Sequence, residues 1–438
     1  MLEEAAPTGD KPLTSDSDST ERRRRLLDQF RHVREFSTRL CQNLEPEDCV
    51  VQSMPDVSPT KWHLAHTTWF FETFVVKAWV PQYRSAVPEY AYLFNSYYNA
   101  AGDMHRRDLR GLISRPTVAE THRFRESIDQ YVTELIAKAD DILLSKMEPV
   151  IELGIHHEQQ HQELLVTDIK HVFFQNPLYP VFRPASAERT KNEVRSQRFI
   201  EFDEAIVEIG HEGSRFSYDN EGPRHRALVP RFFLANRLVT NGEYLKFMAD
   251  SGYSRSEFWL SLGWTTVNEQ RWQAPLYWVQ RDGAWWNFTL SGMRPVNEFE
   301  PVTHVSYFEA DAFANWSGAR LATEFEWERV AAHLPIKGNF VDEERFHPVP
   351  AASDESAIAQ MFGDVWEWNR SSYLPYPGYR AVPGALGEYN GKFMCNQMVL
   401  RGGSCATSRS HIRPTYRNFF QPEKRWQFTG IRLARDPA

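Results

Sequence analysis

Two histidines one helical turn apart are the residues of this chain best suited to metal chemistry. They lie in the run His157-Glu-Gln-Gln-His161. Side chains at positions i and i+4 project from one face of a helix, so both rings can reach a single ion. Apolar residues such as Leu153 and Leu164 follow the same face, which predicts that both rings point inward. His156 falls on the polar side of this pattern, and we leave it out of the ligand set.

A third histidine comes from an earlier segment that is rich in aromatic residues. His66 has Trp62 four residues before it and Trp69 and Phe70 three and four residues after it. Rings at those spacings share its helical face, so the pattern favours His66 over His63, whose column carries threonines. Three neutral imidazoles suit Zn(II), Fe(II) or Cu. Three protein ligands also leave coordination positions open, which is typical of a catalytic metal.

The pattern HExxH also occurs in zinc proteases, in which the glutamate is the general base. Such a protease needs a third ligand downstream, and nothing of the metzincin form follows His161. Glu158 is equally compatible with a position beside the ligands or at the surface.

Four helical segments must position these histidines. We expect one helix over about 21–44, a second that begins at Ser58-Pro59, a third from Thr117 to about 144, and a fourth from near Pro149 to 176. Thr117 and Glu120 have the spacing of a capping box. Four long helices in about 150 residues indicate a bundle. The long irregular connection over 80–116 is a candidate functional segment.

A change in composition divides the chain. Residues 1–19 are rich in Ser, Asp, Thr and Pro, and we expect disorder there. The bundle then occupies 20–175, a proline-containing linker 176–200, and a second domain 201–438. In the second domain only 307–316 and 324–332 have a helical pattern, so we expect α+β structure with short strands.

Composition limits the class of protein. The chain has 438 residues and a net charge of -8, which predicts two domains and no affinity for nucleic acid. The four cysteines form no close pair, as is typical of a reducing compartment. With no apolar segment long enough to cross a bilayer, we expect a cytoplasmic enzyme without a membrane partner. A homo-oligomer is compatible with the sequence.

Two groups of spaced motifs in the C-terminal half carry a family resemblance. One runs from Pro301-Val-Thr-His to Arg320-Leu-Ala-Thr-Glu-Phe-Glu-Trp-Glu328. The other comprises Gly363-Asp-Val-Trp-Glu-Trp368, Arg401-Gly-Gly-Ser404 and Gly430-Ile-Arg-Leu433. These resemble the formylglycine-generating-enzyme (sulfatase-modifying-factor) fold, which is C-type-lectin-like. The positions that match that family's cysteine pair hold Thr407 and Ile412, with Cys405 displaced, so formylglycine generation is not expected.

The N-terminal half resembles DinB-like metal-binding four-helix bundles. A DinB-like bundle joined to a sulfatase-modifying-factor domain resembles the sulfoxide synthases of ergothioneine biosynthesis. The resemblance extends to Trp62-His-Leu-Ala-His66, Phe94-Asn-Ser-Tyr-Tyr98 and Arg417-Asn-Phe-Phe420. It implies a non-haem Fe(II) enzyme that uses O2 to join the sulfur of cysteine or γ-glutamylcysteine to C2 of the imidazole of hercynine, and that oxidises the sulfur to a sulfoxide.

The resemblance also implies a substrate-binding set. Gln160 is expected to hydrogen-bond the bound imidazole. Asn418, Phe419 and Phe420 are candidates to surround the permanent cation of hercynine, because aromatic faces attract quaternary ammonium groups. Trp426 is a further aromatic candidate for this role.

Two arginines and two tyrosines complete the expected site. Arg107 and Arg110, three residues apart, are expected to bind the carboxylate of the thiol substrate. A phenol of Tyr97 or Tyr98 is expected to deliver a proton that steers the reaction from thiol oxidation toward C–S bond formation. The Tyr-Tyr pair resembles the subtype that tends to accept free cysteine. The site should lie between the two domains.

Two other classes remain open. DinB-like bundles include zinc-dependent hydrolases and thiol transferases, and sulfatase-modifying-factor folds also serve as non-catalytic scaffolds. Inward-facing histidines in a separate bundle argue against a scaffold alone.

Overall fold

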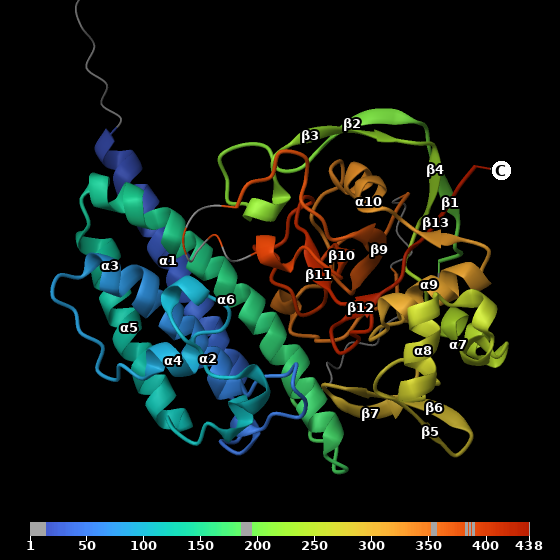
Figure 1. The fold of residues 1–438 in the computed structure, drawn as a ribbon, viewed down its shortest axis with the longest axis horizontal. Helices are drawn as coiled ribbons and strands as arrows, with labels where there is room; N and C mark the ends of the chain where they lie inside the picture. The colour runs from blue at the N-terminus through green and yellow to red at the C-terminus, as the bar shows by residue number, and fades with distance from the viewer. Residues whose placement is uncertain are drawn as a thin grey trace, which may run out of the picture.

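The computed structural model describes residues 15–184, 195–351, 357–381, 384, 387 and 390–437. A helical N-terminal half packs against a C-terminal half that contains the strands, and α6 runs along the boundary between them (Figure 1). The expected α+β class, with a bundle followed by a sheet-containing part, is confirmed. Within the described part of the chain, no helix combines the length and apolar composition that a bilayer crossing requires.

Four long helical segments build the N-terminal half. They are α1 (Ser15–Cys41), α2 (Thr60–Phe71), α5 (Val118–Lys138) and α6 (Asp141–Gln175). A π-helical turn, Glu72–Val76, continues α2 into the short α3 (Lys77–Trp79). The long connection contains α4 (Tyr90–Phe94) and two 3-10 segments, Asn99–Ala101 and Arg107–Leu112. The bundle therefore brings α2 and α6 together, and these are the helices that carry the predicted ligands.

Helix boundaries differ from the sequence expectations where capping decides them. The third helix ends at Lys138, and the fourth begins at Asp141 rather than near Pro149, which lies inside it. Asp140 sets this start, because its side chain accepts a hydrogen bond from the Leu143 backbone N–H at 2.8 Å. The capping box at Thr117 is present as predicted.

Two other helix starts also differ. Pro59 occupies the N-cap position of α2, and Ser58 makes no cap but donates its backbone N–H to Asp168. At the N-terminus, α1 begins at Ser15, inside the segment 1–19 for which disorder was expected. Residues 1–14 lie outside the described residues.

Two four-stranded sheets organise the C-terminal half. The first has the order β1-β4-β13-β8, formed by Phe199–Phe202, Phe232–Ala235, Leu433–Arg435 and Arg320–Leu321, and all its pairs are antiparallel. The second has the order β11-β10-β9-β12, formed by Asn418–Phe420, Met398–Arg401, Trp366–Ser372 and Thr429–Gly430. Its β9–β12 pair is parallel. The expected linker 176–200 thus runs into the first strand, and its residues 185–194 lie outside the described residues.

Smaller sheets and helices surround this pair. A ribbon pairs β2 (Ala205–Ile209) with β3 (His225–Val229), and a three-stranded sheet contains β5 (Trp278–Arg281), β6 (Ala284–Thr289) and β7 (Gly292–Pro295). Four helices, α7 (Asn241–Ala249), α8 (Ser261–Gln270), α9 (Tyr307–Trp316) and α10 (Glu324–Ala331), pack around the sheets. The expectation of only two helices was wrong, since α7 and α8 are also present. A capping box at Thr240 and Glu243 begins α7 and is readable in the sequence.

The two halves share a hydrophobic core. One continuous cluster of buried residues contains Trp62 and Trp69 of α2 together with Trp366 and Trp368 of β9. Hydrogen bonds also cross the boundary, such as the one from the Trp366 indole to Glu163 of α6 at 2.8 Å. One face of α6 therefore completes the bundle while another is covered by the second domain.

Candidate metal centre and interdomain cavity

Three histidines from α2 and α6 converge inside the bundle. His66, His157 and His161 are all buried, and one ring nitrogen of each lies within 4.8 Å of the others. Nε2 of His66 is 3.1 Å from Nε2 of His157. The structure thus brings together the three residues that the helical pattern selected.

The His66 ring is oriented by its neighbours. It stacks between Trp62 and Trp69, with ring centroids 4.6 and 5.6 Å away. Its Nδ1 lies 2.6 Å from the carbonyl oxygen of Phe94. A carbonyl only accepts, so Nδ1 carries the hydrogen and Nε2 presents a lone pair toward His157.

The chemistry of the three rings fits a divalent cation. Burial lowers the pKa of all three rings, and brings that of His157 to about 3. The rings are therefore neutral, which is the form that binds metals. Two nitrogens each about 2.1 Å from one ion at a right angle would lie about 3 Å apart, which matches the separation of the Nε2 atoms of His66 and His157.

Glu158 is turned away from the histidines into a buried ion network. Its carboxylate accepts hydrogen bonds from Arg34 at 2.7 Å, from Ser37 at 2.5 Å and from Arg125. Burial raises the pKa of this carboxyl, but Arg125 and Arg34 outweigh burial and bring the pKa to about 2. A carboxylate with these partners stabilises the bundle and is not positioned as the general base of a zinc protease.

Two histidines that the pattern set aside are buried as well. His63 contacts His161 and Asp168. His156, predicted to lie on the polar side of the helix, has an exposed fraction of 9% because the second domain covers that side of α6. Its Nδ1 lies 3.0 Å from Nδ1 of His411, and its ring stacks on Phe216 at 3.9 Å. Helical periodicity cannot distinguish a solvent-facing side from one covered by another domain.

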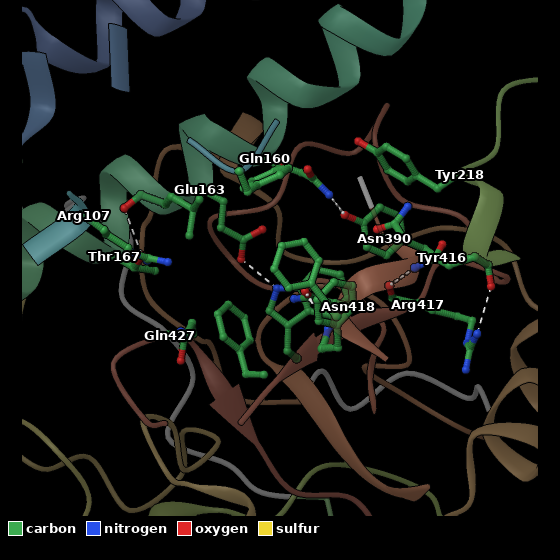
Figure 2. A pocket seen from close by; sticks show the side chains of 17 residues that line it. Arg107, Gln160, Glu163, Thr167, Tyr218, Asn390, Tyr416, Arg417, Asn418 and Gln427 are labelled. Atoms are coloured by element: carbon green, nitrogen blue, oxygen red, sulfur yellow. Dashed lines mark hydrogen bonds between the residues drawn. The ribbon is translucent and has the colours of Figure 1, made fainter. Parts of the chain in front are cut away.

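A cavity of about 210 Å³ lies between α6 and the second domain. Figure 2 shows Gln160 and Glu163 extending from the helix toward Tyr416 and Asn418. Aromatic and polar side chains form its wall: Tyr97, Arg107, Gln160, Glu163, Leu164, Thr167, Tyr218, Asn220, Trp366, Asn390, Phe393, Tyr416, Arg417, Asn418, Phe419, Phe420 and Gln427.

Six of the predicted site residues line this cavity. They are Tyr97, Arg107, Gln160, Asn418, Phe419 and Phe420. Tyr98, Arg110 and the three histidines are not part of its described wall, and neither is Trp426. The metal centre and the cavity are nevertheless adjacent along α6, because Gln160 precedes His161 and Leu164 lies one turn beyond it.

Glu163 is an acidic cavity residue outside the predicted site. Its carboxylate accepts hydrogen bonds from Trp366 at 2.8 Å, Ser404 at 2.5 Å and Thr407 at 2.7 Å. Among the described residues it forms no ion pair. Burial raises the pKa of the carboxyl, and the hydrogen bonds from these three residues offset only part of that rise. Ser404 of the Arg-Gly-Gly-Ser motif was visible in the sequence, but its partner on α6 was not.

Gln160 is held in place from the second domain. Its side-chain N–H donates to the Tyr416 hydroxyl at 2.6 Å, and that hydroxyl lies 3.0 Å from Nε2 of His411. The amide of Gln160 is therefore oriented at the cavity wall rather than free in solvent.

The two tyrosines span the space between the cavity and the histidines. Tyr97 lines the cavity and stacks on Tyr98, with ring centroids 4.8 Å apart. Tyr98 is fully buried, and its ring centroid lies 6.4 Å from that of His157. Of the two phenols, Tyr98 is close to the metal centre and Tyr97 is close to the cavity.

The two arginines occupy different environments. Arg107 is exposed at the cavity wall and donates to the backbone carbonyl of Asp56 at 2.6 Å. Arg110 is buried against Trp62, with its guanidinium carbon 3.4 Å from the ring centroid, and donates to the hydroxyls of Ser58 and Ser96. Burial, and then the charge of Arg107, lower the pKa of Arg110. Among the described residues no carboxylate pairs with Arg110, and binding of a substrate carboxylate by the two arginines stays a prediction.

Comparisons with known protein families match both halves of the chain. A model described as sulfatase-modifying factor enzyme 1-like domain matches residues 189–349 and 341–437. A model described as DinB superfamily matches residues 29–165. The expected pairing of the two domain types is therefore confirmed.

Curated relatives match most of the chain or about half of it. A protein named hercynine oxygenase from Mycolicibacterium smegmatis is 31% identical over 450 aligned residues, covering 94% of this chain and 99% of that protein. A hercynine oxygenase from Mycobacterium tuberculosis is 39% identical over 242 residues, covering 50% of this chain and 56% of that protein. Ergothioneine biosynthesis protein 1 from Schizosaccharomyces pombe is 29% identical over 234 residues, covering 50% and 28%.

Proposed function

This chain belongs to the hercynine oxygenase family, and from that premise we propose that it is an Fe(II)-dependent sulfoxide synthase of ergothioneine biosynthesis. The reaction joins the thiol sulfur of cysteine, or of γ-glutamylcysteine, to C2 of the hercynine imidazole. One C–H and one S–H bond are lost, one oxygen atom of O2 becomes the sulfoxide oxygen, and the other leaves as water. The proposal rests mainly on the buried three-histidine centre next to an interdomain cavity.

His66, His157 and His161 are the proposed ligands of the iron. When bound, the metal supplies open coordination positions at which the thiol and O2 are activated. The protein keeps the three rings neutral by burial and excludes water from them, since their exposed fractions are 0%, 1% and 9%. Zinc would occupy the same ligands, which is why metal identity belongs in the test.

The cavity has the chemistry expected of a site for hercynine. The quaternary ammonium of this substrate carries a permanent positive charge. The rings of Phe419 and Phe420 line the cavity, and Glu163 adds a buried carboxylate that has no cationic partner among the described residues. Aromatic faces and an opposite charge together favour a quaternary ammonium over a neutral group. Gln160 and Asn418 are the proposed hydrogen-bonding partners of the imidazole and of the substrate's polar groups.

Arg110 and Arg107 are the proposed partners of the thiol substrate. A buried guanidinium whose hydrogen-bond partners are neutral hydroxyls is costly, and a carboxylate ligand would compensate it. Arg110 has these surroundings, with Ser58 and Ser96 as its partners. Arg107 at the cavity wall would contact the same substrate from the more exposed side. We propose free cysteine as the preferred donor, with γ-glutamylcysteine as the competitor to be tested.

A tyrosine hydroxyl is the proposed proton donor. Tyr98 is the nearer of the pair to the histidines, and Tyr97 stacks on it from the cavity. A phenol at this position can deliver a proton during oxygen reduction. It would thereby favour C–S bond formation over oxidation of the thiol alone.

The decisive experiment measures oxygen consumption by anaerobically Fe(II)-loaded protein. Oxygen uptake should require hercynine and a thiol together, and mass spectrometry should find the sulfoxide of the coupled product. A competition between cysteine and γ-glutamylcysteine identifies the donor. Absence of the coupled sulfoxide with both thiols would reject the proposal.

Ligand variants and metal analysis test the metal centre itself. His66→Ala, His157→Ala and His161→Ala should each lose iron on desalting, and full activity in one of them would remove that residue from the ligand set. Zinc in the native protein, together with loss of activity on iron loading, would instead support a zinc-dependent hydrolase or thiol transferase.

A further inference from the structure

A chain of three buried side chains extends from the metal centre toward the second domain. Nδ1 of His161 lies 2.9 Å from Nδ1 of His63, and Nε2 of His63 lies 3.0 Å from a carboxylate oxygen of Asp168. His63 and Asp168 are each only 3% exposed. His161 and Asp168 both belong to α6 and are two helical turns apart, while His63 reaches between them from α2.

The hydrogens along this chain follow from the types of its groups. A carboxylate only accepts, so Nε2 of His63 carries a hydrogen and donates it to Asp168. In the neutral form of His63 this is the only N–H, which leaves its Nδ1 as an acceptor. Nδ1 of His161 must then carry a hydrogen, and Nε2 of His161 keeps its lone pair. That lone pair is what a metal ligand requires.

Asp168 is itself held from both halves of the molecule. One carboxylate oxygen accepts the backbone N–H of Ser58, just before α2, at 2.8 Å. The other accepts the indole N–H of Trp426, from the second domain, at 3.1 Å. Trp426 is buried and packs against Phe420 of the cavity wall, with ring centroids 5.6 Å apart. The position of Asp168 therefore depends on docking of the second domain.

We propose that His63 and Asp168 are positioning residues for the metal centre, and that Trp426 links them to the second domain. This positioning role rests on the proposed metal site, and it belongs to His63, which the helical pattern did not select as a ligand. His66 gains the corresponding support from the backbone carbonyl of Phe94. His161 instead depends on side chains, which can be substituted one at a time.

We call the hydrogen-bonded chain His161–His63–Asp168–Trp426 the relay. Binding of Co(II) to the intact protein tests it without relying on turnover. We would measure the Co(II) dissociation constant by chelator competition, together with the visible absorption bands of the bound ion. His63→Leu removes the acceptor for His161 and should weaken binding about 10- to 100-fold, the usual effect of losing such a partner. His63→Asn returns an oxygen near the position of Nδ1 and should recover most of that loss.

Two further variants keep the test valid if His63→Leu does not fold. Asp168→Asn preserves size and should weaken Co(II) binding about tenfold. Trp426→Phe should weaken it less, and affinity equal to that of the parent would overturn the link to the second domain. His171→Leu is the matched control, because it removes another buried histidine of α6 whose partner is Ser53. Its affinity should stay within about twofold of the parent.

The outcomes separate this inference from the proposed function. If the parent binds no stoichiometric Co(II), or if His157→Ala binds as the parent does, the proposed metal site fails and the relay fails with it. If the parent binds normally, and folded His63→Leu and Asp168→Asn match its affinity and spectrum, only the relay is overturned. A spectrum showing loss of a nitrogen ligand in His63→Leu, without recovery in His63→Asn, would make His63 a ligand and would also overturn the positioning role.

Discussion

Replacing Glu163 by glutamine should weaken hercynine binding selectively. The variant keeps the shape of the side chain, and its amide can still accept from Trp366 and Ser404 while its N–H group faces the Thr407 hydroxyl. The negative charge that a bound cation would favour at the cavity wall is no longer possible. Because three neutral groups hold the carboxylate in the parent protein, the substitution should change the charge of the site and leave the fold unchanged.

The size of the effect follows from Coulomb's law. A carboxylate and a quaternary ammonium about 5 Å apart attract by about 3 kcal/mol at an effective dielectric constant near 20. Solvent in the cavity reduces this value, so a loss of about 1–3 kcal/mol is expected, which corresponds to about a 5- to 150-fold higher KM for hercynine. The kcat at saturating hercynine should change by less than about threefold, because Glu163 is expected to bind the substrate rather than to take part in proton transfer.

The assay uses Fe(II)-loaded protein at saturating cysteine and measures sulfoxide formation against hercynine concentration. Inhibition by imidazole propionate, which lacks the cationic group, provides the internal comparison, and its inhibition constant should not rise. Glu152→Gln is the control variant, since Glu152 is a half-buried carboxylate of the same helix outside the described cavity wall. An unchanged KM in Glu163→Gln, or equal weakening of both ligands, would refute the proposed cation site.

The remaining predictions concern the proton donor, the thiol site and the bundle. Tyr98→Phe and Tyr97→Phe should shift the product from the coupled sulfoxide toward cysteine sulfinate, and an unchanged product ratio in both would remove the tyrosines from proton transfer. Arg110→Gln should raise the KM for cysteine at least tenfold with a smaller effect on that for hercynine, as measured by varying each substrate in turn. Glu158→Gln should lower the free energy of unfolding by about 3–5 kcal/mol, because it leaves Arg34 and Arg125 without their shared carboxylate. The folded pKa of Glu158 is depressed to about 2, so its contribution to stability is present above its unfolded pKa near 4.3 and is lost as the pH falls toward 2. Urea unfolding of parent and variant from pH 7 to pH 3 should therefore show a shrinking difference in the free energy of unfolding. A difference that stays constant with pH would contradict this account.

Local patterns were sufficient where one helix decides the outcome. The i, i+4 pair His157 and His161, the ring-flanked His66 and the capping box at Thr117 depend only on spacing within a helix, and the structure has each as expected. The start of α6 at Asp141 differs from the expected start near Pro149 because the Asp140 side chain satisfies one of the first free backbone N–H groups, that of Leu143.

Contacts between different helices and strands could not be predicted from such patterns. The carboxylate of Glu163 meets Ser404 and Thr407, more than 200 residues away. His156 is buried because the second domain covers a side of α6 whose residues are mostly polar. Arg107 and Arg110 are close in sequence, yet one is exposed and the other is buried against Trp62.

The three histidines illustrate the division most clearly. By itself the sequence determined which rings point into the bundle, because helical periodicity and flanking apolar residues fix a side chain's direction relative to its own helix axis. Only the tertiary structure decided what supports those rings. His63 lies beside His161, and Asp168 accepts a hydrogen bond from Trp426, because α2, α6 and the second domain pack together. A hydrogen bond between elements depends on their relative placement in three dimensions, and spacing along one helix carries no information about that placement.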